Sequence, residues 1–222
     1  MVKILVIGSG AREHAIIKSL NRSKKEKEIY CLASNNNPGI SGICKEIKIM
    51  DINDAQLIKD YSIKQGINIA IIGPENPLAF GVADSLWEAG IGVIGPKKNL
   101  AQIETSKSFT RNLLKEYKIP GCPKFKTFAN MGGVEDFLSL LGNNYVVKYD
   151  GLAGGKGVKV AGDHLHSHEE ALSYCKELIE GGGHFVIERK LTGEEFSLMS
   201  FCDGENLSHM PAVQDHKRAF EN

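Results

Sequence analysis

Short apolar runs alternate with amphipathic segments through residues 1–120, and this alternation restricts the fold more than any other feature. Residues 2–7 form an apolar run that stops at Gly8-Ser9-Gly10, after which apolar residues recur at helical spacing. Residues 67–72 form a second such run, which Gly73-Pro74 ends in the same way. Strands that alternate with helices are typical of a parallel, doubly wound sheet. We therefore predict a Rossmann-like α/β domain whose ligand site lies where residues 8–13 and 73–78 follow their strands.

The remaining elements of this domain follow from the same signals. Asn53-Asp54 can cap a helix that Gly66 ends, and one continuous helix is expected over residues 78–89, before Gly90. Further strands are expected at residues 28–33, 46–51 and 91–94.

A second, smaller unit follows a helix that begins at Thr105-Ser106 and a linker marked by Pro120, Gly121 and Pro123. The pattern predicts strands at residues 124–128, 145–149, 158–161 and 185–187, and helices at 134–141 and 167–179. Asp203-Gly204 lies between two strand-like runs and favours a two-residue type I′ hairpin turn. This unit is predicted to be an α+β domain.

Composition excludes several classes of function. Lys and Arg number 27 and Asp and Glu number 27, so the formal net charge is zero, which disfavours nucleic acid and anionic membranes as partners. The apolar runs are far shorter than the roughly 18 residues that a spanning helix needs. The five cysteines are odd in number and include no C-x-x-C, so neither a disulfide framework nor a thiolate zinc site is expected. These features favour a cytoplasmic protein.

The strongest local signal is the glycine-rich stretch of residues 148–158, which lies between two predicted strands. Its backbone N–H groups can bind phosphate oxygens, while Lys148 supplies positive charge from a strand. The stretch is not a P-loop, because the G-x-x-x-x-G-K-[ST] spacing is missing. A flexible hairpin with solvated lysines is the alternative. The residue types favour a site for a triphosphate.

Residues 8–14, Gly-Ser-Gly-Ala-Arg-Glu-His, are similar to a dinucleotide fingerprint, but Glu13 takes the place of its third glycine. NAD binding is therefore disfavoured. The turn and helix start could hold one phosphate with help from Arg12, or form an ordinary tight turn. Glu75 follows the strand predicted at residues 67–72, where it could meet sugar hydroxyls or an amine, or simply favour a helix start.

Two polar clusters are ambiguous when they are considered alone. Residues 214–218 contain an acid, an imidazole and two cations, a combination that is usually a solvated turn. His164, His166 and His168 alternate in a polar segment before a capping box, which indicates a surface tract rather than a metal site.

Taken together, six motifs resemble the amino-terminal half of the phosphoribosylamine–glycine ligase family, within the ATP-grasp superfamily. The resemblance runs from residue 2 to residue 218. The motifs, in chain order, are residues 8–14, residues 73–78, Ser106-Lys107-Ser108-Phe109, residues 148–158, residues 186–188 with 193–195, and Gln214-Asp215-His216-Lys217-Arg218. The loop and the Glu188 region indicate ATP-grasp alone, whereas the first two motifs and the last narrow the resemblance to this ligase.

The resemblance implies the fold, the reaction and the site residues. It implies a Rossmann-like domain (1–104), a helix and linker (105–123), a small ATP-grasp subdomain (124–191) and the start of a larger one (192–222). The implied reaction of purine synthesis joins glycine to 5-phosphoribosylamine through glycyl phosphate, with ATP consumed. Lys107 and Lys148 would contact ATP phosphates, Glu188 with the backbone to Leu191 would read adenine, and Glu195 would hold the ribose. The implied nucleotide-binding residues are Lys107, Lys148, Gly151, Gly154, Gly155, Lys156, Gly157, Glu188, Leu191 and Glu195; the substrate-binding residues are Gly10, Arg12, Glu13 and Glu75; the catalytic residues are Asp215, His216, Lys217 and Arg218.

The chain also departs from the family pattern. Gly154-Gly155 replaces the usual Ala-Gly, and the polar stretch at residues 34–39 is longer than the family's loop, so no contacts are assigned to it. The ligands for Mg²⁺ or Mn²⁺ are expected beyond residue 222, so we expect no metal site within the 222 residues and no turnover by them alone. The alternatives are another ATP-grasp carboxylate–amine ligase or a non-catalytic nucleotide-binding module. The sequence predicts no particular oligomeric state.

Overall fold

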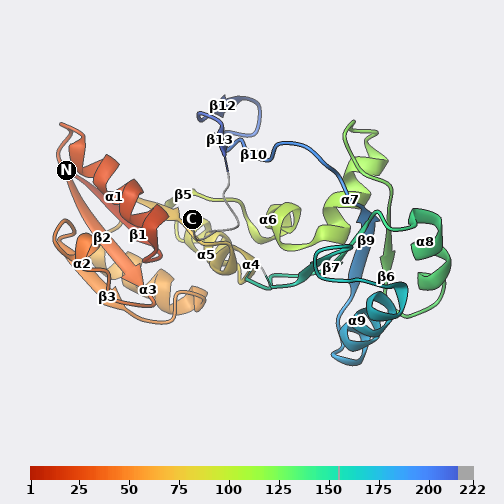
Figure 1. Ribbon diagram of the computed structural model, residues 1–222. Coiled ribbons are helices and arrows are strands. Elements are labelled where there is room, and N and C mark those ends of the chain that lie inside the picture. Colours follow the sequence, from red (N-terminus) through yellow and green to blue (C-terminus); the bar gives the residue numbers. More distant parts are fainter. Residues whose placement is uncertain (155, 215–222) are drawn as a thin grey trace, which may run out of the picture.

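The computed structural model describes residues 1–154 and 156–214, which form two sheets and a separate hairpin (Figure 1). The first sheet has five parallel strands in the order β3-β2-β1-β4-β5. These are β1 (Val2–Ile7), β2 (Lys27–Ala33), β3 (Glu46–Ile49), β4 (Ile69–Ile72) and β5 (Gly92–Ile94). The predicted Rossmann-like architecture is confirmed.

Strand β1 lies at the centre of this sheet, where the strand order reverses. It pairs with β2 on one side and β4 on the other, so that Ile7 lies opposite both Leu32 and Ile72. The loops that follow β1 and β4 therefore begin side by side, at the position where open α/β sheets bind their ligands.

Helices cover both faces of the sheet, because successive side chains of each strand point in opposite directions. Leu5 and Ile7 pack in one core, with residues of α3 (Ala55–Gln65) and α5 (Val82–Glu88). Ile4 and Val6 pack in the other core, with residues of α1 (Ala11–Arg22) and α2 (Pro38–Ser41).

One prediction for this half of the chain was wrong, and one helix was missed. The expected helix over residues 78–89 is two helices, α4 (Glu75–Ala79) and α5, because Gly81 between them has a left-handed backbone with φ of +81°. Helix α6 (Lys98–Thr105) was not predicted. Its N-cap residue makes no side-chain cap, and the Lys98 N–H instead donates to the Asp84 carboxylate on α5 at 2.8 Å. A cap supplied from another helix leaves no local sequence signal.

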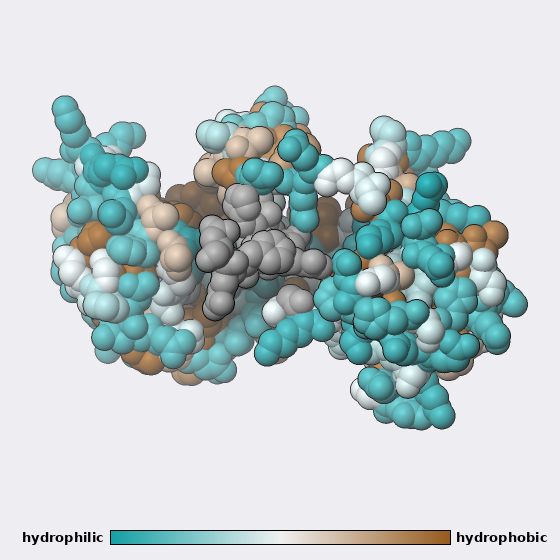
Figure 2. Space-filling view, viewed as in Figure 1, coloured by the Kyte–Doolittle hydropathy of each residue, from teal (hydrophilic) through white to brown (hydrophobic). Residues whose placement is uncertain are grey.

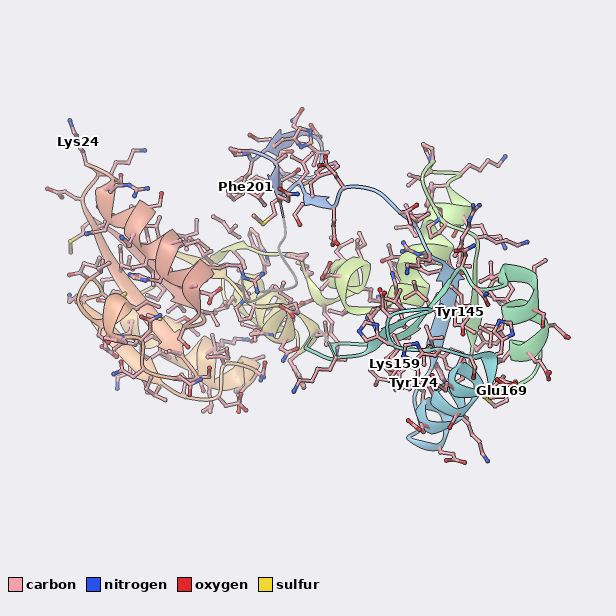
Figure 3. All side chains as sticks on the ribbon, viewed as in Figure 1. Lys24, Tyr145, Lys159, Glu169, Tyr174 and Phe201 are labelled. Atoms are coloured by element: carbon pink, nitrogen blue, oxygen red, sulfur yellow. The ribbon has the colours of Figure 1, made fainter. Side chains whose placement is uncertain are left out.

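The second sheet is antiparallel, with the strand order β6-β9-β7-β8. Its strands are β6 (Phe125–Phe128), β7 (Tyr145–Tyr149), β8 (Val158–Val160) and β9 (Phe185–Arg189). Helices α8 (Val134–Leu141) and α9 (His168–Glu180) pack on one face, and α7 (Lys107–Glu116) contacts β9. Figure 3 shows Lys159 beside Tyr174 of α9, with its ammonium nitrogen 3.8 Å from the ring centroid.

The hairpin after β9 consists of two short antiparallel pairs, β11 (Ser200–Cys202) with β12 (Leu207–His209) and β10 (Phe196–Ser197) with β13 (Val213–Gln214). The predicted two-residue type I′ turn was wrong, because four residues separate Cys202 from Leu207. The Asp203 carboxylate accepts the N–H groups of Glu205 and Asn206 and so stabilises the longer turn. Apolar side chains of the hairpin are exposed (Figure 2).

Within the described part of the chain, no helix has the length and apolar character needed to cross a membrane.

Candidate functional site

The first candidate site lies between the loops that follow β1 and β4. Gly8 has φ of +116° and its N–H donates to Leu32 O at 2.8 Å, while the Gly73 N–H donates to Ile7 O at 3.0 Å. These bonds continue the ladders of the sheet into both loops. The two loops are therefore fixed beside each other by the backbone of β1 and β2.

Glu13 of α1 is buried between these loops, with 5% of its surface exposed. Its Oε2 atom accepts the Gly10 N–H at 2.6 Å. A Cβ atom at Gly8 would lie 2.8 Å from Glu13 Cγ, and one at Gly73 would lie 2.6 Å from Glu13 Cδ. Glycine is therefore needed at both positions to make room for the carboxylate. Because Glu13 also takes the Gly10 N–H, that donor is not available to a phosphate.

Two other predicted substrate residues lie on the helices that follow these loops. Arg12 is exposed in the first turn of α1, and no residue of the described structure is its hydrogen-bond or ion-pair partner. Glu75 is half-buried at the first position of α4. This edge of the sheet therefore presents two carboxylates and one guanidinium group. Carboxylates suit an amine or sugar hydroxyls, and the guanidinium suits a phosphate.

Asn37 adds a contact that the sequence analysis did not assign. Its Nδ2 donates to Ser9 O at 2.9 Å, and its Oδ1 accepts the Gly39 N–H at 3.0 Å as the N-cap of α2. The polar stretch after β2 thus fastens the turn after β1. The one sequence signal for this contact is that the polar stretch follows a predicted strand, so that it lies at the same edge of the sheet as residues 8–13.

The second candidate site lies on the face of the antiparallel sheet opposite α8 and α9. Tyr145 and Val147 of β7 point into the core, so Lys148 points to the other face. On β9, Ile187 is in the core and Glu188 points to the same face as Lys148. The register places Val186 opposite Lys148, so Lys148 and Glu188 are diagonal neighbours. The Lys148 ammonium group forms an ion pair with Glu188 Oε1.

Arg111 on α7 binds the other oxygen of the same carboxylate. Its Nε donates to Glu188 Oε2 at 2.7 Å, and 6% of the Glu188 side chain is exposed. Burial acts to raise the pKa of Glu188, but hydrogen bonds and charge from Arg111 and Lys148 outweigh it, so the pKa lies below its usual value. Glu188 is therefore a buried carboxylate, ionised at neutral pH, with one cation on each oxygen.

Lys107, the first residue of α7, contacts the start of the glycine-rich loop. Its ammonium nitrogen donates to Gly151 O at 2.9 Å. Burial lowers the pKa of Lys107, and the charge of Asp150 opposes this effect. Lys107 thus places a positive charge beside Gly151, at the start of the glycine-rich loop, where phosphates are expected to bind.

Asp150 joins α7 to this loop. Its carboxylate accepts the Ser108 N–H at 3.1 Å, the Ser106 hydroxyl at 3.2 Å and also the Ser108 hydroxyl. The Asp150 N–H itself donates to His184 O at 2.9 Å. These contacts explain why serines flank Lys107, since both hold the helix start against the first residue of the loop.

The described residues of the glycine-rich loop form an open connection between β7 and β8. Gly151 and Gly154 have positive φ values of +155° and +55°, which favour glycine. Gly157 lies close to Tyr149, since a Cβ atom there would be 3.0 Å from Tyr149 Cβ. Lys156 is exposed, and Gly155 lies outside the described residues.

The remaining predicted residues lie beyond β9. Leu191 is 67% exposed. Glu195 directly precedes β10. Asp215, His216, Lys217 and Arg218 lie outside the described residues. In residues 1–154 and 156–214, no group of three or more His, Cys, Asp or Glu side chains could hold a metal ion.

Two family models match the chain. That of the phosphoribosylglycinamide synthetase N domain matches residues 2–104, and that of the phosphoribosylglycinamide synthetase ATP-grasp (A) domain matches residues 105–222. The chain belongs to this family. The resemblance inferred from six motifs is thereby confirmed.

Similar members of the phosphoribosylglycinamide synthetase family come from methanogens. The phosphoribosylamine–glycine ligase of Methanosarcina barkeri is 47% identical over 220 residues, which are 99% of this chain and 50% of the relative. That of Methanococcus vannielii is 49% identical over 228 residues, covering 100% of this chain and 51% of the relative. The chain spans about half the length of these curated relatives.

Solved structures agree with the ATP-grasp fold of the family. The phosphoribosylamine–glycine ligase of Thermotoga maritima superimposes with a TM-score of 0.78 at 26% identity, over 98% of this chain and 51% of that one. The N5-carboxyaminoimidazole synthetase of Staphylococcus aureus, solved with ADP, gives 0.72 at 15% identity, over 98% and 55%. The second likeness concerns the fold alone.

Proposed function

We propose that the chain supplies the phosphoribosylamine site and much of the nucleotide site of an enzyme that joins glycine to 5-phosphoribosylamine with ATP. The observation that carries this proposal is the convergence of Lys107, Lys148 and Glu188 at the base of the glycine-rich loop. The identity of 47–49% to phosphoribosylamine–glycine ligases supports this reaction over that of another ATP-grasp ligase. The full reaction is proposed for a protein of the relatives' length.

The nucleotide site would use two cations and the loop backbone. Lys107 and Lys148 would neutralise phosphate charge, while the N–H groups of the loop between Gly151 and Gly157 would bind phosphate oxygens. Glu188 would accept the adenine amino group, and backbone groups through Leu191 would bind the ring edge. Glu195 would hold ribose hydroxyls, and Lys156 would approach the phosphates as the loop closes.

A divalent metal ion, when bound, would neutralise and align the phosphates. The described residues offer no ligand set for it, so the roles proposed here are assigned to side chains and backbone alone.

The phosphoribosylamine site would use the two carboxylates and the arginine beside the first sheet. Arg12 would bind the phosphate, because its guanidinium is exposed and lacks a partner within the described structure. Glu13 and Glu75 would bind the amine and ribose hydroxyls, and Gly10 would keep the turn close to the ligand. Asp215, His216, Lys217 and Arg218 would face the reacting groups.

Calorimetric titration of the 222-residue chain with ADP, with EDTA present, tests the nucleotide site. We expect one binding site, and we expect Lys148→Met to weaken it by about tenfold, equal to 1.4 kcal/mol. Lys64→Met, which removes an exposed lysine in the last turn of α3, is the matched control and should change nothing. A wild-type chain that gives no heat with ADP would refute the proposal.

The acceptor is tested in a protein of full family length. Arg12→Ala and Glu75→Gln should raise the KM for phosphoribosylamine. They should leave the KM for ATP unchanged, because both residues belong to the proposed phosphoribosylamine site and neither belongs to the nucleotide site. Unchanged use of phosphoribosylamine by both variants would instead favour a ligase with another acceptor amine.

A further inference from the structure

Arg111 is a half-buried cation to which the proposed function assigns no role, and it contacts Glu188 of the nucleotide site. Its side chain is 22% exposed, and its Nε atom donates to Glu188 Oε2 at 2.7 Å. The hydrogen bond and charge of Glu188 raise the pKa of Arg111 above its usual value. Both members of the pair are therefore charged at neutral pH.

The ion pair between Lys148 and Glu188 limits what Lys148 can do. One of its three N–H donors is directed at Glu188 Oε1, and a movement of the ammonium group towards a nucleotide phosphate would lengthen or break this ion pair. If Lys148 moves, a carboxylate that is 95% buried by residue surface loses one of its two cations. Removing one partner of a buried ion pair is strongly unfavourable unless another partner remains.

Arg111 is suited to be that remaining partner. It reaches Glu188 from α7, whereas Lys148 reaches it from β7, and each occupies a different oxygen. On the third neighbouring element, β6, the residue opposite Glu188 is Phe125, which carries no charge. Lys107, also on α7, interacts with Glu188 through charge only. Arg111 is thus the cation, among the described residues, that can stay bonded when Lys148 leaves.

We propose that Arg111 is a positioning residue, which holds Glu188 so that Lys148 can transfer its ammonium group from Glu188 to the phosphates of a bound nucleotide. This inference rests on the proposed nucleotide site and adds a residue to it. Arg111 acts through Glu188 and contacts no substrate. Nucleotide binding is then an exchange of partners by Lys148, with Glu188 kept ionised and oriented towards adenine throughout.

A double-mutant cycle tests the coupling. ADP binding is measured by calorimetry in EDTA for the wild-type chain, Arg111→Gln, Glu188→Gln and the double variant. Arg111→Gln should weaken ADP binding by about tenfold, equal to 1.4 kcal/mol. In the Glu188→Gln background, Arg111→Gln should change the affinity for ADP by less than about threefold, because Arg111 no longer has a carboxylate to hold. Equal effects in both backgrounds would overturn the proposal.

Adenosine separates positioning from general loss of structure. Adenosine has no phosphate, so Lys148 need not leave Glu188, and Arg111→Gln should weaken adenosine binding by less than about threefold. An equal loss for adenosine and ADP would show a merely structural role and overturn the proposal. Arg111→Lys should restore most of the ADP affinity, since it returns a cation to the same carboxylate. Lys115→Gln removes an exposed cation one turn along α7 and should bind ADP as the wild type does.

A measurement on the unmutated chain covers the case in which Arg111→Gln does not fold. Carbon-13 NMR of labelled glutamate, assigned with Glu188→Gln, should show the Glu188 carboxylate ionised at pH 5.5 with and without ADP. Protonation of Glu188 when ADP binds would overturn the proposal. Failure of the wild-type chain to bind ADP would refute the proposed nucleotide site itself, which is a different outcome from binding without coupling between Arg111 and Glu188.

Discussion

Replacing Gly73 by alanine tests whether Glu13 fills the space between the two ligand loops. The added Cβ would lie 2.5 Å from Glu13 Cγ and 2.6 Å from Glu13 Cδ. Ordinary carbon contacts are about 3.5–4.0 Å, so about 1 Å must be recovered by movement. The backbone at Gly73 lies outside the left-handed region, and the strain therefore comes from the contact with Glu13 and not from φ.

The expected loss of stability has two parts. Overpacking a tight site typically costs about 1–3 kcal/mol. If Glu13 moves to relieve the contact, it loses the hydrogen bond from the Gly10 N–H at 2.6 Å, and a bond to a charged group contributes about 1.5–3 kcal/mol. Because movement of Glu13 relieves part of the overpacking, the two parts do not add in full, and we expect Gly73→Ala to lower the free energy of unfolding by about 2–4 kcal/mol.

Urea unfolding, monitored by tryptophan fluorescence, measures this loss of stability in the domain that contains Gly73. Trp87 is the single tryptophan, and it lies on α5 beside the first sheet. Gly42→Ala is the matched control, because its nearest contact would be 3.8 Å away and its φ is −75°. We expect that control to unfold within about 0.5 kcal/mol of the wild type.

Removing the Glu13 side chain provides the decisive comparison. In a Glu13→Ala background the Gly73→Ala substitution should cost less than about 0.5 kcal/mol, because the atoms it would meet are absent. If Gly73→Ala costs as much in that background as in the wild type, then Glu13 does not occupy the space between the loops.

Three further predictions concern the second half of the chain and its thiols. Because the cations lower the pKa of Glu188, its contribution to stability is present above about pH 4.5 and is lost as pH falls through the lowered pKa. Lys148→Met removes one cation, so the acid limb of a urea-stability profile should move to higher pH; an unmoved limb would show that the ion pair does not keep Glu188 ionised. ADP should slow amide hydrogen exchange between Gly151 and Gly157, and unchanged exchange would refute closure of this loop over the phosphates. Burial raises the pKa of Cys31 to about 12, so iodoacetamide at pH 8 should label exposed Cys202 well before Cys31, as peptide mass spectrometry would show; equal rates would contradict that burial.

The sequence predicted those parts of the fold whose signals are local. The strand at 145–149 and the helix at 134–141 were placed at their observed bounds, because a short apolar run and apolar residues at helical spacing lie within the segments themselves. Helix α6 was missed because Asp84, a residue of another helix, caps it. The four-residue turn at Asp203 was mistaken for a tighter one, since its length depends on the pairing of Cys202 with Leu207.

The candidate sites likewise contain residues that local sequence signals could predict and residues that only distant contacts bring into place. Lys148 and the glycine-rich loop could be read from adjacent residues, as could the carboxylate at Glu13. Arg111 could not, because it meets Glu188 only when α7 packs against β9, 77 residues further along the chain. Asp150 was likewise seen only as part of the loop, whereas its carboxylate holds Ser108 from a helix 42 residues earlier.

The open hairpin has a practical consequence for work with this polypeptide. Phe196, Phe201 and Leu207 each leave more than half of their surface in contact with water, and the strands that carry them are only two or three residues long. At neutral pH the chain has no net charge to keep molecules apart. Concentrated samples near pH 7 will therefore tend to self-associate through this segment, and dilute samples at a pH well away from 7 offer the better colloidal behaviour for titration and spectroscopy.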